Sequence, residues 1–298
     1  MKILIAYDGS AHADLAVEDL SWAGLPKQCQ AMVVSVVESH SSHQWMTDVK
    51  TALQAAESAS NRLQSLFPDW DVWLETPSGH AATMILERAA TWPAGLIVVG
   101  THGRKGIARL VLGSVSNKIV HEASCSVRAA RTGIGRVDTP VRLLIGNDGS
   151  PEGEAAVDEV CGRSWRAGAE ARVLSAVQTL APVDAASYEL ASHSLLASAT
   201  FLKSDAEERL RCTGVVEASA RKLQNAGLQV SIAVEDGDPK RALIHHARTW
   251  NADTIFVGAR GLGLVDRFVL GSVSSAMVAE APCTVEVVRH HLETPLLS

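Results

Sequence analysis

The stretch VGTHGRKGIARLVLGSVS, residues 99–116, recurs in the same chain as VGARGLGLVDRFVLGSVS at residues 257–274. Each copy follows a short apolar run and has the spacing Gly, two residues, Gly, nine residues, Gly-Ser. Residues 99–131 align without a gap to residues 257–289 and are identical at 16 of 33 positions. A duplication of this length indicates two repeats of one structural unit.

The beginning of the chain is also duplicated, as KILIAYDGS at 2–10 and RLLIGNDGS at 142–150. The offset is 140 residues here and 158 residues at the glycine motif, so the second repeat contains 18 additional residues. We place them in a polar, Ala- and Ser-rich stretch at about 178–205 and expect it to be irregular. The predicted domains are residues 1–134 and 141–292.

Short β-branched runs alternate in both repeats with longer segments of helical periodicity. In the first repeat we predict strands near 2–7, 31–37, 70–75, 95–100 and 125–130, and helices near 11–24, 47–66, 79–92 and 114–123. In the second repeat we predict strands near 141–147, 170–177, 228–234, 253–258 and 283–288. Continuous apolar strands that alternate with helices form parallel sheets covered on both faces. The predicted fold class is therefore α/β, with two tandem doubly wound domains of five parallel strands each.

Composition and charge narrow the class of protein. The chain is 47% hydrophobic and 20% charged, as expected for a globular protein with buried cores. Its net charge of -6, without a basic stripe, argues against nucleic acid as a partner. The first residues lack a signal-peptide pattern, and no apolar run approaches the roughly 18 residues of a membrane span. We therefore expect a cytoplasmic protein without membrane contact, whose five cysteines are reduced and buried.

Both glycine motifs and both Asp-Gly-Ser segments follow predicted strands, at the edge where doubly wound sheets bind ligands. Gly113 and Ser114 open a predicted helix, whose unpaired N–H groups and dipole suit a phosphate. The Ser114 and Ser116 hydroxyls could add hydrogen bonds. Asp8 is placed to accept hydrogen bonds from a ribose or a base. Together these features predict a nucleotide site.

The two glycines that follow the fourth strand, Gly100 and Gly103, are expected to adopt backbone conformations closed to other residues and to let a ligand approach the main chain. A structural explanation is open for each feature alone, because glycines after strands and serines at helix N-caps are common without a ligand. The joint occurrence in both repeats favours a ligand site. The motif is neither a Walker loop nor a dinucleotide-binding G-x-G-x-x-G.

The G-x2-G-x9-G-S motif, with Asp-Gly-Ser after the first strand and a closing C-x-V strand, resembles the universal stress protein family in its tandem form. The resemblance covers nearly the whole chain. It implies an adenine nucleotide α-hydrolase-like fold with strand order 3-2-1-4-5 in each domain. It also implies ATP, or the related AMP or ADP, as the ligand, with Mg²⁺ as an open addition.

The same resemblance implies the residues of both sites. In the first site, Asp8 would lie near adenine and ribose, Val36 against the base and Gly100 by the ribose. The phosphates would contact Gly103, Gly113, Ser114, Val115 and Ser116. The second site would comprise Asp148, Ala176, Gly258, Gly261, Gly271, Ser272, Val273 and Ser274. Neighbouring candidates are Ala6, Tyr7, His102 and Arg104 in the first repeat, with Gly146, Asn147 and Arg260 in the second. Many nucleotide-binding members carry Pro where this chain has Ala6 and Gly146, so we expect a base pocket of different shape.

Catalysis is not predicted, because the residues near the motif include no convincing general base, no nucleophile with an activating partner and no cluster of metal ligands. His102 lies between two glycines, but its equivalent is Arg260, which cannot act as a base. The leading hypothesis is a stress-response protein that binds ATP and acts as a nucleotide-dependent regulatory or signalling module. One alternative is an interaction module with empty sites that acts through the 178–205 insertion, and another is a slow ATPase. An adenylate-forming or pyrophosphatase enzyme is disfavoured, because AYDGS is not the phosphate loop of those enzymes.

Two further expectations concern the pair of domains. The last strands, 125–130 and 283–288, are apolar edges, so the halves should pack there about a pseudo-two-fold axis as an intramolecular dimer, and a further homodimer is left open. The wrapping loops also differ in charge. The first contains Arg104, Lys105 and Arg109, and the second contains Asp266 and Arg267. We therefore expect the first site to bind phosphates more tightly.

Overall fold

The computed structural model describes residues 1–38, 44–101, 112–131, 139–177, 195–262 and 270–289, with side chains in the helix that begins at Leu195 described from residue 205 onward. The strands of the first half are β1 (Lys2–Ala6), β2 (Gln30–Val34), β3 (Asp71–Glu75), β4 (Leu96–Gly100) and β5 (Ser126–Ala130). Those of the second half are β6 (Arg142–Gly146), β7 (Glu170–Val177), β8 (Gln229–Asp236), β9 (Thr254–Gly258) and β10 (Thr284–Val288). Every strand expected from the sequence is present within a few residues of its predicted position.

The ten strands form one sheet in the order β3-β2-β1-β4-β5-β10-β9-β6-β7-β8. Neighbouring strands run parallel within each half. Each half therefore has the predicted five-stranded parallel sheet with the order 3-2-1-4-5. The halves join through β5 and β10, which pair antiparallel with Glu286 opposite Arg128. These two residues are equivalent positions of the repeats, 158 residues apart, so a local two-fold axis passes between them.

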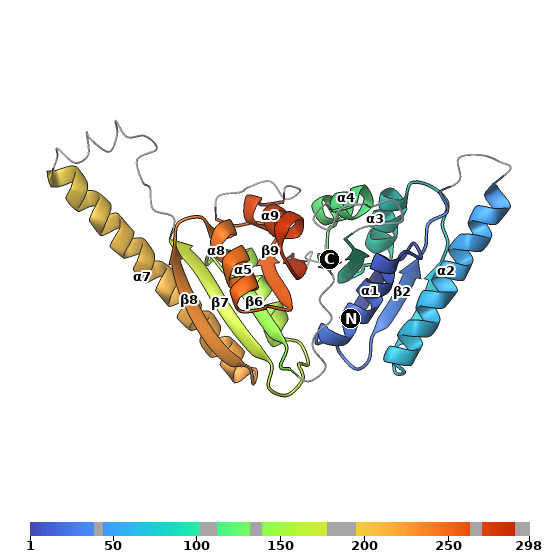
Figure 1. Cartoon of the computed structure of the whole chain (residues 1–298), viewed down its shortest axis with the longest axis horizontal. Helices are drawn as coiled ribbons and strands as arrows, with labels where there is room; N and C mark the ends of the chain where they lie inside the picture. The colour runs from blue at the N-terminus through green and yellow to red at the C-terminus, as the bar shows by residue number, and fades with distance from the viewer. Residues whose placement is uncertain (39–43, 102–111, 132–138, 178–194, 263–269, 290–298) are drawn as a thin grey trace, which may run out of the picture.

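Eight α-helices with described bounds cover the sheet. In the first half they are α1 (Ala11–Asp19), followed by the 3-10 turn η1 (Leu20–Trp22), then α2 (Trp45–Leu66), α3 (Ala81–Thr91) and α4 (Ser114–Glu122). In the second half they are α5 (Pro151–Cys161), α7 (Leu195–Asn225), α8 (Pro239–Thr249) and α9 (Ser272–Glu280). Helices α4 and α9 lie on either side of the middle of the molecule, with α2 and α7 at its two outer ends (Figure 1). Within the described part of the chain, no helix combines the length and apolar character needed to span a bilayer.

The apolar core is divided by the sheet. On one side α1 and α2 pack on the first half, and α5 and α7 pack on the second. On the other side α3, α4, α8 and α9 share a single buried cluster that continues from one half into the other, from Ile119 to Met277 for example. The two domains thus have a common core on the side that carries α4 and α9.

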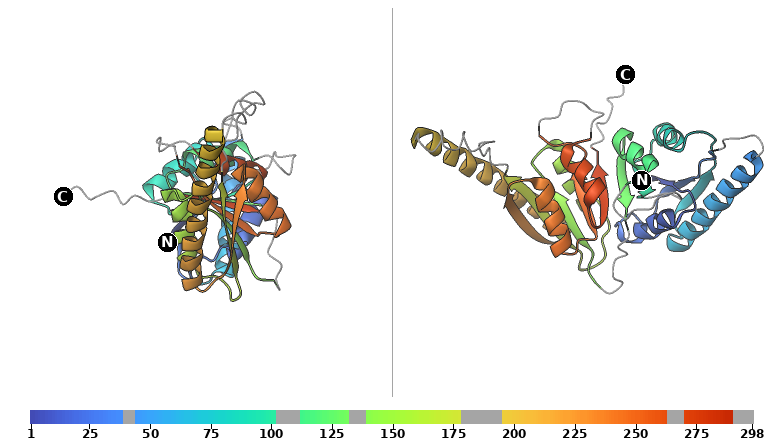
Figure 2. Two further views of the ribbon diagram at one scale, coloured as in Figure 1. Left: turned by 90° about the vertical axis from the view of Figure 1, so that its left-hand side faces the viewer. Right: turned by 45° about the horizontal axis from the view of Figure 1, so that its top comes forward.

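The expected irregular insertion is only partly correct. Helix α7 is 31 residues long, whereas its counterpart α2 has 22, and it begins at Leu195 inside the predicted insertion. The sequence from 195 to 213 has neither Gly nor Pro, and extending an established helix is easier than starting one. The extension carries α7 beyond the outermost strand, β8 (Figure 2). The earlier portion, 178–194, lies outside the described residues.

A buried cluster of charges surrounds the local two-fold axis. The Arg128 guanidinium donates to Asp19 Oδ2 at 2.5 Å and to Glu286 Oε2 at 3.0 Å, and both Arg128 and Glu286 are fully buried. Arg163 of the second half also pairs with Glu286 and donates to Ala23 O at 2.8 Å. The Arg128–Glu286 pair and the hydrogen bond from Arg163 to Ala23 O each join the two halves, so this cluster ties the domains together inside the molecule.

Candidate nucleotide site

The two sequence motifs of each half meet at one edge of the sheet. Strand β1 pairs with β4, and β6 pairs with β9. The Asp-Gly-Ser segment and the glycine motif therefore leave neighbouring strands at their carboxyl ends, which is where doubly wound sheets bind ligands. The geometry that the strand order predicted is present in both halves.

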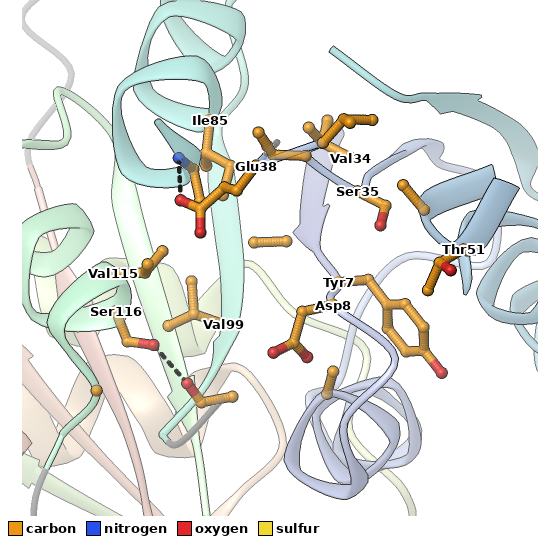
Figure 3. Close-up of a pocket in the computed structure, with 18 of the residues that line it drawn as sticks. Tyr7, Asp8, Val34, Ser35, Glu38, Thr51, Ile85, Val99, Val115 and Ser116 are labelled. Carbon is orange, nitrogen blue, oxygen red and sulfur yellow. Dashed lines mark hydrogen bonds between the residues drawn. The ribbon is translucent and has the colours of Figure 1, made fainter. Parts of the chain in front are cut away.

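In the first half these segments line a pocket of about 920 Å³, a volume within the range of small-molecule sites. Figure 3 shows the Asp8 carboxylate and the Val99 and Val115 side chains directed into it. The predicted site residues that line it are Ala6, Tyr7, Asp8, Val36, Gly100, Gly113, Ser114, Val115 and Ser116. His102, Gly103 and Arg104 lie outside the described residues.

Asp8 is oriented by the start of helix α1. Its Oδ1 accepts a hydrogen bond from the backbone N–H of Ser10 at 3.0 Å. Ser10 is itself the N-cap of α1, and its Oγ accepts from Ala13 N at 3.2 Å. The turn therefore fixes the Asp8 carboxylate at the pocket wall, where it can accept hydrogen bonds from hydroxyl groups.

The N-terminus of α4 forms another part of the wall. Gly113 is the N-cap in an extended conformation, and within the described ranges no side chain caps this end. The Gly113 N–H is already used, since it donates to Thr101 O at 2.7 Å. The remaining N–H groups of the first turn, from Ser114 onward, lie at the pocket and provide donors and a positive dipole end for an anion.

The Ser116 hydroxyl has a structural partner. Its Oγ donates to Gly100 O at 2.6 Å (Figure 3), and Ser274 Oγ donates in the same way to Gly258 O at 2.6 Å. Each serine thereby links the end of the fourth strand to the first turn of the following helix. The hydrogen of this hydroxyl is occupied, so a phosphate would depend on the backbone donors of α4 instead.

The expected unusual backbone conformation at Gly100 is wrong, because Gly100 is not among the glycines with positive φ. A Cβ at Gly100 would lie 2.7 Å from His12 O, and one at Gly258 would lie 2.6 Å from Glu152 O. These distances are too short for a real side chain. Both glycines are required because the helix after the first strand packs directly against the fourth strand.

Other pocket residues were not predicted from the sequence. They come from the end of β2, from α2 and from the start of α3, and they include Ser35, Glu38, Asp48, Thr51 and Ile85. Glu38 Oε1 accepts the N–H of Ala81 at 2.9 Å, so it joins the β2 end to the N-terminus of α3. No motif marks these positions. They lie beyond the end of β2 or in the first two turns of α2 and α3.

Burial and hydrogen bonding also set the state of Tyr7. Its hydroxyl donates to Asp14 at 2.5 Å, and Asp14 pairs with Arg62 of α2. Burial, followed by the hydrogen bond and charge of Asp14, raises the pKa of Tyr7 to about 12. Tyr7 is therefore a neutral hydrogen-bond donor at physiological pH.

In the second half the motif residues are bonded to one another. Asp148 Oδ1 accepts from Ser150 N at 3.0 Å, and its Oδ2 accepts from Leu262 N at 3.0 Å. A Cβ on Gly261 would lie 2.5 Å from that same Oδ2. The Asp148 carboxylate is thus in direct contact with the glycine loop of its own domain.

The neighbouring side chains of the second site are also engaged. Arg260 pairs with Glu152 of α5. Arg211 of α7 donates to Asp148 O at 2.7 Å, and the Cys212 thiol contacts Ala176 O at 3.8 Å. Asn147, which replaces Tyr7, is buried and donates to Glu154 and to Ser219. Each of these side chains therefore already has a partner within the protein.

The remaining predicted residues of the second site occupy the same edge. Gly146 ends β6, and an added Cβ there would lie 3.2 Å from Leu243 and from Val257. Gly271 is the N-cap of α9, with φ -64 and ψ 156, and Ser272 and Val273 form its first turn. The backbone of the element that is expected to bind phosphate is therefore repeated in both halves.

The universal stress protein family model matches residues 1–131 and 141–289. The chain belongs to the universal stress protein family. Universal stress protein A homolog 2 of Coxiella burnetii is 32% identical over 138 residues, which cover 44% of this chain and 94% of that protein. A universal stress protein of Mycobacterium bovis is 28% identical over 200 residues, which cover 66% of this chain and 62% of that protein.

Solved structures match nearly the whole chain of this universal stress protein. The crystal structure of a universal stress protein from Archaeoglobus fulgidus has a TM-score of 0.65 at 18% identity, covering 97% of this chain and 98% of that one. A Pseudomonas aeruginosa PAO1 protein of unknown function has a TM-score of 0.60 at 17% identity, with coverages of 97% and 92%. At these identities the likeness supports the tandem fold alone.

Proposed function

We propose that this universal stress protein binds an adenine nucleotide in its first domain and acts as a nucleotide-dependent regulatory module in the cytoplasm. The observation that carries the proposal is the pocket in which Asp8, an apolar wall and the N-terminus of α4 converge. ATP, ADP and AMP all suit such a site, and Mg²⁺ would enter with the phosphates.

Each part of the nucleotide has a matching surface. Val34, Val36 and Ile85 offer apolar area for a planar base. The Asp8 carboxylate, held by Ser10 N, can accept hydrogen bonds from ribose hydroxyls. The backbone donors at the start of α4 lie at the same pocket and suit the phosphates.

The second domain is the weaker site in this proposal. Opening it to a nucleotide requires the Asp148 carboxylate to leave the N–H of Leu262. The positive charge of Arg260 is balanced by Glu152, which reduces its attraction for a phosphate. Breaking such contacts lowers the net affinity of any ligand that binds there.

Nucleotide addition to the purified protein tests the proposal. A ligand that binds only the folded state raises the melting temperature. We expect Mg-ATP to raise it and GTP to raise it less, because guanine reverses the hydrogen-bonding pattern of adenine. Equal shifts with both nucleotides contradict an adenine site, and no shift with either supports the alternative of an interaction module with empty sites. Release of phosphate from ATP, followed on the same sample, tests the slow-ATPase alternative.

Gly113→Asp provides the residue-level test. Aspartate is a favourable N-cap residue, so helix α4 should remain folded, while the added carboxylate repels phosphate at the same place. We expect the ATP-induced rise in melting temperature to fall by more than half in this variant. Gly214→Asp is the control, because it adds the same carboxylate at an exposed position of α7 where a new Cβ meets nothing within 4 Å, and it should keep most of the effect.

A further inference from the structure

Two arginines at equivalent positions cross from one domain to the other. Arg131 follows β5 and Arg289 follows β10, and they are 158 residues apart, as the repeats are. The Arg131 N–H donates to Thr284 Oγ1 and the Arg289 N–H donates to Ser126 Oγ, each at 3.2 Å. Each arginine is thus anchored by its backbone to the last strand of the opposite domain.

The side chains reach the helices that carry the phosphate-binding ends. The Arg289 guanidinium donates to Val120 O at 2.7 Å, to His121 O at 3.4 Å and to Cys125 O at 3.3 Å. The Arg131 guanidinium donates to Val278 O and, at 3.0 Å, to Ala279 O. Arg289 therefore holds the C-terminus of α4, and Arg131 holds that of α9.

These carbonyls are the ones that a helix cannot satisfy by itself. The last backbone bond of α4 runs from Ala123 N to Ile119 O at 2.9 Å, and that of α9 runs from Ala281 N to Met277 O at 3.0 Å. The next two carbonyls of each helix have no partner further along the helix. Each arginine donates to those two carbonyls and places its positive charge at the negative end of the helix dipole.

Both contacts are shielded from water. Arg131 is buried and Arg289 is half-buried, and the side chains of α4 and α9 share one core cluster. Hydrogen bonds from a charged donor to carbonyls are among the stronger ones in such surroundings. Nine-residue helices of about 13 Å are short enough to move as rigid bodies, so holding one end also fixes the other.

We propose that Arg289 and Arg131 are positioning residues in trans, so that each nucleotide site depends on an arginine supplied by the other domain. Arg289 fixes α4, whose N-terminus lines the first site, and Arg131 fixes α9, whose N-terminus belongs to the second. This inference rests on the proposed function for its effect on nucleotide affinity. The tandem arrangement then has a direct role, because neither site is complete within its own repeat.

Hydrogen–deuterium exchange of the nucleotide-free full-length protein tests the positioning itself. We expect Arg289→Met to increase exchange in α4 more than in α9, and Arg131→Met to do the reverse. Arg289→Lys keeps the positive charge but loses the planar guanidinium that donates to more than one carbonyl. Its exchange in α4 should lie between that of the wild type and that of Arg289→Met. An equal increase in both helices, or none in either, overturns the proposal.

Nucleotide affinity tests the consequence. In a Gly271→Asp background, in which only the first site is left open, Arg289→Met should weaken ATP binding about fivefold or more, with Arg131→Met changing it by less than about twofold. Altered exchange with unchanged affinity overturns the dependence of the site on Arg289. If the Gly271→Asp parent protein shows no ATP binding at all, the proposed function fails, and the exchange pattern alone then decides whether the arginines position the helices. Melting temperatures of all variants show whether a loss of affinity reflects global unfolding.

Discussion

The two halves of the molecule share one backbone plan but treat the same site differently. In the first half, Tyr7 donates to Asp14, and Arg62 pairs with Asp14 and Glu18. In the second half, Asn147 donates to Glu154, and Lys222 pairs with Glu154 and Asp158. The ion pairs of Arg62 and of Lys222 join the helix after the first strand to the long helix of each domain. The scaffold contacts were retained in altered chemical form.

The ligand-facing positions differ more. Thr51 of α2 lines the pocket of the first half, whereas α7 directs Arg211 to the backbone of Asp148 in the second. The Asp148 carboxylate also accepts the N–H of Leu262 in its own glycine loop. The first-half counterpart of Leu262, Arg104, lies outside the described residues, so unequal availability of the two sites stays a prediction.

The largest expected effect is a loss of stability at the junction of the two halves, where β5 pairs with β10. Arg128→Met should lower the free energy of unfolding by about 3–5 kcal/mol, because Asp19 and Glu286 lose a buried partner. The measurement is urea denaturation at equilibrium. Arg62→Met is the matched control, since its ion pairs are partly exposed and should be worth about 1 kcal/mol or less. Equal losses in the two variants would show that burial at the junction does not decide the difference.

A smaller effect concerns the stability of the first half at alkaline pH. The pKa of Tyr7 is raised to about 12 in the folded protein, from an ordinary value near 10. A raised pKa of an acidic group gives stability that is fully present below pH 10 and lost as the pH rises through 12. We expect the free energy of unfolding to fall by about 2–3 kcal/mol across this window.

The control for this prediction is Tyr7→Phe. Phenylalanine has no ionisable hydroxyl, so the part of the alkaline loss that comes from Tyr7 should disappear. Absorbance near 295 nm follows phenolate formation directly. Asn147, at the equivalent place, has no titratable group. Burial raises the pKa of the Cys283 thiol to about 12 and that of Cys125 to about 11, so these thiols add to the alkaline loss equally in the parent protein and in Tyr7→Phe. An alkaline loss that is unchanged in Tyr7→Phe would assign it to other groups.

Much of the fold could be predicted from the sequence because local signals agreed with the final structure. Apolar runs such as LIVV at 96–99 became β4, and the repeats placed both glycine motifs at the same edge. The start of α4 at Ser114 followed from its Gly-Ser N-terminus. These features are set by periodicity and by short-range hydrogen bonding.

Features that depend on contacts between distant segments were missed. Position 100 needs glycine because the backbone oxygen of His12, in helix α1, lies too close to leave room for a side chain. The Glu38–Ala81 contact and the Asp148–Leu262 contact join segments 43 and 114 residues apart, with no spacing rule to indicate them. The sequence did not predict the helical part of the insertion, from Leu195 onward. Its polar, Ala- and Ser-rich composition is compatible both with an irregular loop and with the first turns of a long helix. Such features follow from tertiary packing rather than from local pattern.

The smallest expected effect is the difference in affinity between the two sites of the native chain. The Gly271→Asp variant reports the first site and the Gly113→Asp variant reports the second, since both place an aspartate at the N-cap of the phosphate-binding helix. A Cβ at Gly271 would lie 3.3 Å from Ala259 O, so Gly271→Asp requires an adjustment of only a few tenths of an ångström. We expect the first site to bind ATP about tenfold more tightly, which corresponds to about 1.4 kcal/mol.

Two independent contributions lead to that value. The loop of the first repeat has three cationic residues, whereas the loop of the second has Arg267 and Asp266. Screened charges near a triphosphate contribute a few tenths of a kcal/mol to about 1 kcal/mol each. In addition, Arg260 is neutralised by Glu152 and Asp148 is held by Leu262 N. Calorimetric titration at two salt concentrations separates these contributions, because the loop charges are weakened by salt and the Asp148 hydrogen bond is much less so. A tenfold gap that persists at 0.5 M salt would assign the difference in affinity to the contacts of Asp148. A Gly113→Asp protein that binds ATP as tightly as the Gly271→Asp protein would contradict both contributions.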